Sequence, residues 1–252
     1  MPDALVGSTG FVGSNLRAAR SFEGLFHSRN IASMRGQRFR EVWFCGLPAT
    51  KWQINQDPAA DLANMQAIQQ VLEHVECEHF VLVSTIDVYQ DHAYGAHRRM
   101  FEQWIETRYR SQTTVRLPGL FGPGLKKNVL FDLLTGNRLE HVHPEDAYQW
   151  YDLADLLADV AVVRSHGEAC ADLFPEPVEN SRILPLFESI DPASLPQPNR
   201  EPRRYDFASA QAEMFGGVGG RYIRSSDQML QRLRQFIAAW PHTDDGSPRP
   251  PT

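Results

Sequence analysis

The chain has 252 residues, a formal net charge of −6 at neutral pH, and 42% hydrophobic and 10% aromatic residues. This length and composition predict one large domain, or a domain with a small additional lobe, around a substantial core. The negative charge argues against nucleic-acid binding, which needs clustered positive charge. No apolar run has the length of a bilayer span, and no signal peptide is evident. The three widely spaced cysteines are most simply explained as reduced thiols of a cytoplasmic protein.

The first apolar segment, residues 4–6, is followed by glycines at regular spacing and then by a helical pattern over residues 11–20. Gly7 permits a tight turn from strand to helix, Gly10 lets the backbone approach a phosphate, and Gly13 lets the helix pack close to the strand. The start of such a helix offers unpaired N–H groups and a partial positive charge. The segment therefore predicts a pyrophosphate site for a dinucleotide.

Strands and helices alternate through the rest of the first half. Strands are predicted at residues 24–27, 41–45, 80–84 and 113–117, with helical segments near 31–35, 59–75 and 97–109. In the helix at 59–75, the apolar face comprises Leu62, Met65, Ile68 and Leu72. This alternation predicts an α/β fold: a doubly wound parallel sheet of the Rossmann type in a nucleotide-binding domain over residues 1–165.

The second half is less regular. Helices are predicted at 128–134, 153–163 and 228–239, and residues 174–205 are rich in proline. We expect residues 166–240 to form a small substrate-side lobe with a closing helix, and the polar tail 241–252 to be disordered.

No metal site is predicted. Cys45, Cys77 and Cys170 are widely spaced and are expected to be reduced thiols. His141 and His143 alternate as strand residues do, but no third ligand is nearby, so zinc binding is not expected.

Polar side chains collect where the fourth strand ends. Ser84 and Thr85 stand there and can hydrogen-bond a substrate oxygen. Tyr94 and Arg98 follow, four residues apart and therefore on one helical face. The cation is expected to favour the tyrosinate and so to lower the pKa of the phenol. His97, a quarter turn away, is expected at the surface.

The choice between NAD and NADP depends on the end of the second strand. NAD-preferring sites place an acid there to bind the ribose 2′-hydroxyl, but residues 26–30 contain none. Arg29 could pair with a 2′-phosphate, which favours NADP. The alternative is that Arg29 is a solvated loop residue.

Together these segments resemble the extended short-chain dehydrogenase/reductase family, in particular its nucleotide-sugar epimerase/dehydratase branch, over residues 1 to about 165. The resemblance implies a glycine triplet at positions 7, 10 and 13 and catalytic roles for Thr85, with Ser84, and for Tyr94. Trp150 to Asp155 resemble the family's aspartate-containing segment, and Glu102 its acid after the tyrosine motif. The implied cofactor-binding residues also include Ser8, Thr9, Phe11, Val12, Leu47, Pro48, Ala49, Asn64 and Pro118.

Two positions depart from the family pattern. Arg98 occupies the place of the motif lysine, where it is expected to bind the cofactor ribose and to tune Tyr94, or alternatively to form a surface salt bridge. Gly119 stands where many sugar-nucleotide enzymes have an asparagine. Lys126 and Lys127 could meet a substrate diphosphate or lie in solvent.

The resemblance implies an NAD(P)-dependent oxidoreductase, epimerase or dehydratase acting on a nucleotide-linked sugar or a related carbonyl compound or polyol. The alternatives are a non-catalytic NAD(P)-binding sensor or partner subunit, and a reductase of a small carbonyl compound. The family also suggests a homodimer built through the helices at 59–75 and 97–109.

Overall fold

The computed structural model describes residues 1–188, 190, 191, 195, 196 and 198–241, which form two compact units. Unit 1 comprises Met1–Leu117 and Ala154–Asp172, and unit 2 comprises Pro118–Leu153 and the chain from Leu173 onward. The chain leaves unit 1 after Leu117 and returns to it at Ala154, because a late strand joins the sheet. The two units therefore differ from the predicted domains, which are divided at residue 165. The expected disordered tail lies, except for Pro241, outside the described residues.

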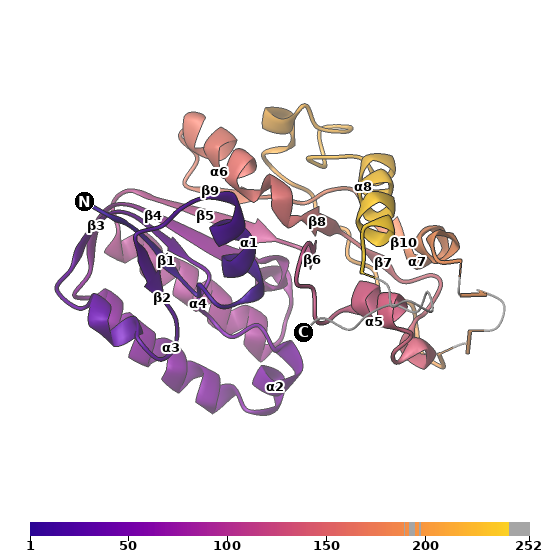
Figure 1. Ribbon diagram of the computed structural model, residues 1–252, viewed down its shortest axis with the longest axis horizontal. Coiled ribbons are helices and arrows are strands. Elements are labelled where there is room, and N and C mark those ends of the chain that lie inside the picture. The colour runs from indigo at the N-terminus through magenta and orange to yellow at the C-terminus, as the bar shows by residue number, and fades with distance from the viewer. Residues whose placement is uncertain (189, 192–194, 197, 242–252) are drawn as a thin grey trace. The chain divides into compact units, whose positions relative to one another are not determined.

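Unit 1 contains a six-stranded, wholly parallel sheet with the strand order β2-β1-β3-β4-β5-β9 (Figure 1). The strands are β1 (Asp3–Val6), β2 (Gly24–Phe26), β3 (Arg38–Phe44), β4 (Glu76–Thr85), β5 (Gln112–Leu117) and β9 (Cys170–Asp172). The predicted strands and the Rossmann-type α/β class are confirmed. The chain order reverses between β1 and β3, where such sheets bind ligands at the carboxyl ends of the strands.

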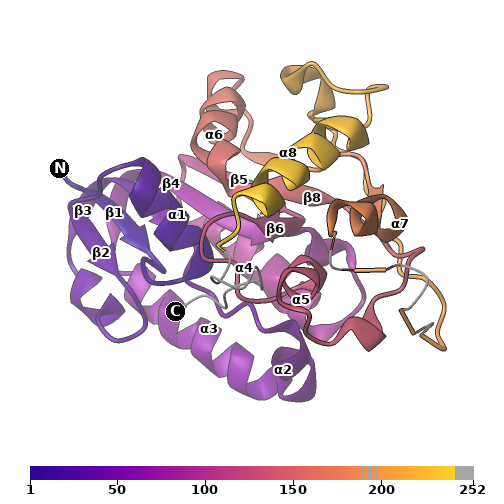
Figure 2. The same cartoon turned by 45° about the vertical axis from the view of Figure 1, so that its right-hand side comes forward.

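Helices cover both faces of this sheet. In the two views, α1 (Phe11–Ala19) and α6 (Leu156–Ser165) lie on one side, while α3 (Pro58–Leu72) and α2 (Lys51–Gln56) lie on the other (Figures 1 and 2). Helix α4 (Ala93–Arg108) packs against α2 and α3. Single-turn helices η1 (Ile31–Met34), η2 (Ile86–Tyr89) and η4 (Leu153–Asp155) complete the connections.

The core of unit 1 lies between the sheet and the α3–α4 layer. Phe44 of β3 stacks on Phe80 of β4 and contacts Phe101 of α4, with ring centroids 6.0 and 5.2 Å apart. The predicted apolar face of α3 is confirmed by three of its members, since Met65, Ile68 and Leu72 are buried and Leu62 is partly buried. Burying such aromatic and aliphatic side chains is the main favourable term that holds the helices on the sheet.

Unit 2 is built from short elements. Strand β6 (Gly119–Phe121) pairs in parallel with β8 (Trp150–Asp152), and β7 (Ala147–Tyr148) pairs antiparallel with β10 (Val178–Glu179). Its helices are α5 (Val129–Thr135), η3 (Leu139–His141), α7 (Asn180–Ile183), η5 (Leu184–Leu186), η7 (Ala212–Phe215) and α8 (Ser226–Ala238).

The predicted helices at 128–134 and 228–239 are confirmed as α5 and α8. The expected strand alternation at His141 and His143 is wrong, because His141 ends the single-turn helix η3.

The three cysteines are free thiols, and burial raises the pKa of each to about 12. Within the described ranges, no helix is both long and apolar enough to cross a membrane.

Candidate active site

The glycine turn between β1 and α1 is shaped by close backbone contacts. Gly7 has φ +86°, and a Cβ there would lie 2.5 Å from the carbonyl oxygen of Cys45. A Cβ on Gly13 would lie 2.1 Å from the carbonyl oxygen of Gly7, whereas one on Gly10 would meet that oxygen at 3.3 Å. Gly7 and Gly13 are therefore required by the fold itself, and Gly10 is the member of the triplet that the fold least requires.

The first turn of α1 offers backbone donors. The N–H groups of Gly7 and Ser8 donate to the Phe26 carbonyl at 2.9 and 3.0 Å, and the first helical bond runs from Ser14 to Gly10. The intervening N–H groups, those of Phe11, Val12 and Gly13, have no acceptor within the helix, and no side chain caps it. Because these donors stand at the positive end of the helix beside the strand reversal, they can hold a pyrophosphate.

The end of β2 carries no acidic side chain. Asn30 organises the turn: its Oδ1 accepts from the backbone N–H of His27 at 2.7 Å, and its Nδ2 donates to the Leu25 carbonyl at 3.0 Å. Arg29 is exposed in this turn. Its guanidinium is therefore accessible to an anionic ligand.

The residues after β3 divide into buried and exposed positions. Leu47 packs against the hydrophobic core, while Pro48 and Ala49 are exposed. Asn64 lies on the exposed face of α3.

Thr85 and Tyr94 are brought together by the η2 connection. Thr85 ends β4 and its hydroxyl accepts from the N–H of Asp87 at 3.2 Å, while Tyr94 stands in the first turn of α4, which packs on η2. This contact depends on Gly95, where a Cβ would lie 2.1 Å from the Asp87 carbonyl oxygen. Only glycine lets the first turn of α4 pack so closely on η2, a requirement that sequence reasoning missed. Ser84 is half-buried one position before Thr85.

Tyr94 is buried, with 7% of its surface exposed. The guanidinium carbon of Arg98 lies 4.6 Å from the centre of its ring, so the two share one helical face as predicted. Burial raises the pKa of the phenol above its ordinary value, and the opposing effects of Arg98 and Thr85 do not overcome it. The expectation of a lowered pKa is wrong because the sequence showed the cation but not the depth of burial.

Arg98 forms a buried ion pair with Asp61. Two parallel hydrogen bonds of 3.0 Å join the guanidinium to both carboxylate oxygens, and a third reaches the Pro48 carbonyl at 2.7 Å. His97 Nδ1 lies 2.7 Å from the same carboxylate and its side chain is buried, so its expected surface position is wrong. Although burial alone would raise the pKa of Asp61, hydrogen bonds from Arg98 and His97 hold it below the ordinary value.

Asp61 could have been found from the sequence. It stands at i, with buried Met65 at i+4 and Ile68 at i+7, so it falls on the apolar face of α3. An acid on such a face must find a partner, because an unpaired buried charge is costly.

A second ion pair lies beside Tyr94. Lys51, the first residue of α2, places Nζ 2.6 Å from Asp87 Oδ1. His92 caps α4, since its Nδ1 accepts from the N–H of Gly95 at 3.0 Å, and its Nε2 lies 3.6 Å from the same Asp87 oxygen.

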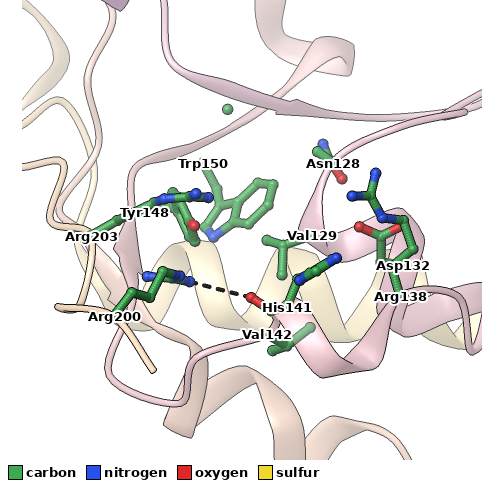
Figure 3. A pocket seen from close by; sticks show the side chains of 11 residues that line it. Asn128, Val129, Asp132, Arg138, His141, Val142, Tyr148, Trp150, Arg200 and Arg203 are labelled. Atoms are coloured by element: carbon green, nitrogen blue, oxygen red, sulfur yellow. Dashed lines mark hydrogen bonds between the residues drawn. The ribbon is translucent and has the colours of Figure 1, made fainter. Parts of the chain in front are cut away.

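Unit 2 contains a pocket of about 600 Å³ (Figure 3). Its lining residues are Gly119, Asn128, Val129, Asp132, Arg138, His141, Val142, Tyr148, Trp150, Arg200 and Arg203. Arg200 and Arg203 lie on one side of the view, Arg138 and Asp132 on the other, and the Trp150 indole between them. The combination of three arginines with two aromatic rings suits an anion that carries an aromatic group.

Asp146 organises one wall of this pocket. It is buried and accepts from Arg200 at 2.6 Å, from the Tyr148 hydroxyl at 2.9 Å and from the backbone N–H of Arg203 at 2.7 Å. Burial alone would raise the pKa of Asp146, but these donors hold it below its ordinary value. Asp132, in contrast, has a pKa raised by burial.

Close contacts in the wall of the pocket explain why residue 119 is a glycine. A Cβ there would lie 3.0 Å from the Gln149 carbonyl oxygen and 3.3 Å from the Trp150 ring, so an asparagine is disfavoured. The indole Nε1 of Trp150 is buried without a hydrogen-bond partner among the described residues. Lys126 and Lys127 are exposed and outside the lining, and Pro118 is buried at the start of unit 2.

The described residues contain no group of three or more histidine, cysteine, aspartate or glutamate side chains that could hold a metal ion.

Neither models of protein families nor curated protein sequences match the chain. Solved structures do match it over nearly its whole length. A dTDP-glucose 4,6-dehydratase from Streptomyces venezuelae, solved with NAD, has a TM-score of 0.68 at 15% identity, covering 95% of this chain and 97% of that one.

Two further structures agree. The UDP-glucose 4-epimerase of Thermotoga maritima, solved with UDP-glucose, has a TM-score of 0.64 at 14% identity, covering 94% of this chain and 98% of that one. A dTDP-4-dehydrorhamnose reductase from Clostridium acetobutylicum has a TM-score of 0.62 at 14% identity, covering 94% and 99% of the two chains. The predicted resemblance is confirmed at the level of structure: the chain has the fold of the extended short-chain dehydrogenases/reductases that act as nucleotide-sugar epimerases, dehydratases and reductases.

Proposed function

We propose that the chain binds a nicotinamide dinucleotide at the carboxyl ends of β1 and β3 and oxidises or reduces a nucleotide-linked sugar by hydride transfer. The observation that carries the proposal is the placement of the buried Tyr94, with Arg98 4.6 Å from its ring centre, in the turn of α4 that packs on η2 directly after Thr85, at the carboxyl end of β4 in the sheet that also carries the glycine turn. A phenol and a hydroxyl at the carboxyl ends of the strands would serve as a proton-transfer pair.

The residues present fit a dinucleotide. The donors of Phe11, Val12 and Gly13 would hold its pyrophosphate, and the exposed Pro48–Ala49 turn would cover its adenosine ribose. When bound, the nicotinamide supplies a hydride acceptor or donor.

We infer a preference for NADP, although three of the similar structures were solved with NAD. The turn at the end of β2 has no acid, and the exposed Arg29 in this turn would pair with a 2′-phosphate.

In the oxidation direction, Tyr94 would accept the hydroxyl proton of the substrate as its carbon gives up a hydride. In reduction, the phenol would return the proton to the carbonyl oxygen. Thr85, with Ser84, would orient that oxygen. Arg98 would limit the cost of forming the phenolate, because its cation lies 4.6 Å from the ring centre. Its contact with the cofactor ribose stays a prediction.

We propose separately that the arginine-lined pocket of unit 2 binds a nucleotide diphosphate group. Its volume suits a ligand of this size, and Arg138 and Arg203 can neutralise phosphate charge, whereas Arg200 is paired with Asp146. The expected test is that Arg203→Ala raises KM for a UDP- or dTDP-linked sugar, while Arg204→Ala, at a neighbouring exposed arginine paired with Glu179, does not.

The first experiment is a fluorescence titration of nucleotide-free protein with NADPH and NADH. We expect micromolar binding, tighter for NADPH, and an Arg29→Ala variant that loses about tenfold in NADPH affinity while keeping NADH affinity. Arg35→Ala, an exposed arginine near the same turn, is the matched control. Binding of neither nucleotide would overturn the proposal. Binding without hydride transfer to any nucleotide sugar would favour a sensor or partner subunit.

A further inference from the structure

The positive charge of Arg98, which occupies the position of the motif lysine, is paired with another residue of the protein. All three hydrogen bonds of the Arg98 guanidinium described above go to Asp61 and the Pro48 carbonyl, and only 4% of Arg98 is exposed. Because Asp61 neutralises this cation at close range, the influence of Arg98 on Tyr94 is smaller than that of an unpaired cation.

A carboxylate also acts on Tyr94. Asp87 stands in η2, two residues after Thr85, and its backbone carbonyl packs against Gly95, the residue after Tyr94. Its negative charge opposes ionisation of the phenol. Left alone, Asp87 would make it harder for Tyr94 to accept the proton of the substrate as a general base.

Lys51 is bound to this carboxylate. Its Nζ lies 2.6 Å from Asp87 Oδ1, and 36% of its side chain is exposed, so its charge keeps contact with water. His92 does not take over this role, since its Nε2 lies 3.6 Å from Asp87 and makes no hydrogen bond to a described residue. The chain has only three lysines, and the other two, Lys126 and Lys127, belong to unit 2.

We propose that Lys51 is a positioning residue for the proposed reaction: by binding Asp87 it offsets the carboxylate beside Tyr94, while Arg98 is held by Asp61. The inference rests on the proposed function of Tyr94 as acid and base. Arg98 of α4 and Asp87 of η2 act on Tyr94 directly. Through their ion pairs they connect it to the other charged and titratable groups nearby, which are His97 of α4, Asp61 of α3, Lys51 of α2 and His92 before α4. Among them, Lys51 and Asp87 form a pair that can be removed without disturbing the buried Asp61 cluster.

The test measures the ionisation of position 94 directly. Difluorotyrosine is inserted at residue 94, so that its lowered intrinsic pKa brings the phenol into a range where the protein stays folded, and its phenolate absorbance is titrated. Lys51→Met should raise the phenol pKa by roughly one unit, because Asp87 loses its counter-charge. Lys51→Arg should restore the original value.

Two further variants separate this role from a structural one. Asp87→Asn alone should shift the phenol pKa in the opposite direction, and Lys51→Met combined with Asp87→Asn should return it close to the original value. Arg38→Met removes one cation of an exposed pair at the other edge of the sheet, where β3 and β4 begin, and should leave the titration unchanged. Thermal unfolding of each variant checks that it is folded.

An unchanged phenol pKa in both Lys51→Met and Asp87→Asn would overturn the inference. If Lys51→Met does not fold, Asp87→Asn decides the question by itself. The nucleotide titration described above is read independently, so loss of nucleotide binding in the unmodified protein would count against the proposed function and not against the role of Lys51.

Discussion

The glycine turn of β1–α1 and the Tyr94 centre of β4–α4 both lie at the carboxyl ends of strands of one sheet. Different interactions determine their geometry. The turn is defined by backbone sterics, with Gly7 and Gly13 in places where any Cβ would overlap a carbonyl. The Tyr94 centre is defined by paired charges, Arg98 with Asp61 and Lys51 with Asp87. The comparison teaches that a residue such as Arg98 can occupy a motif position while its charge is paired with a residue outside the motif, here Asp61.

Glycine does appear in both regions. Gly95 allows α4 to approach η2 just as Gly13 allows α1 to approach the β1 turn, with the same 2.1 Å distance from a hypothetical Cβ to a carbonyl oxygen. In both regions a glycine therefore allows a helix to approach the backbone closely, but only the Tyr94 centre is held by ion pairs.

The largest expected effect tests whether the charged region is catalytic. Tyr94→Phe removes the phenol hydroxyl while keeping the ring beside Arg98. Turnover should fall by about 10²–10⁴-fold, as is typical when an acid–base group is lost, with nucleotide affinity unchanged. Steady-state kinetics and the fluorescence titration measure both quantities. Tyr89→Phe, whose hydroxyl instead bonds Asp172, is the control, and equal turnover in the two variants would remove Tyr94 from the mechanism.

The next effect tests the buried ion pair. Asp61→Ala leaves the buried guanidinium of Arg98 without its carboxylate, and the free energy of unfolding should fall by about 3–5 kcal/mol. Urea denaturation measures the loss. The double variant Asp61→Leu with Arg98→Met should be more stable than Asp61→Ala, because no charge remains unpaired. A loss below about 1 kcal/mol would show that the pair behaves like an exposed one.

The glycine turn should be destabilised even by alanine, which adds only a Cβ. Gly13→Ala forces a backbone shift and should lower the free energy of unfolding by about 2 kcal/mol, within the range for overpacked sites. Gly10→Ala, three residues earlier and with a single 3.3 Å contact, should cost much less. Chemical denaturation compares the two variants, and equal losses would contradict the assignment of separate roles.

The smallest expected effect is on pH dependence. The pKa of Asp61 is lowered in the folded protein, so the unfolded chain binds its proton more readily in acid. The stabilisation is therefore complete above the unfolded pKa, about 4, and is lost as the pH falls through the lower folded pKa. The stability difference between the natural chain and Asp61→Asn should be constant near neutrality and shrink below about pH 4. A difference that grows in acid would contradict this assignment.

Much of unit 1 could be predicted because its signals are local. The apolar run of β1, the glycine spacing and the i, i+4 relation of Tyr94 and Arg98 each depend on a few neighbouring residues. Strand β9 was missed because it is three residues long and ends in Asp172, which carries no strand pattern. Unit 2 was harder still, because its strands of two or three residues have no periodicity to detect.

The sequence by itself determined the class of fold, the glycine turn and the residues placed at the end of the fourth strand, because sterics and periodicity act over short distances along the chain. Only the tertiary structure decided where the charges go. Asp61 and Arg98 are 37 positions apart, and Lys51 and Asp87 are 36 apart. Ion pairs between such distant positions depend on how the helices pack against one another on the sheet. The burial that raises the pKa of Tyr94 depends on the same packing.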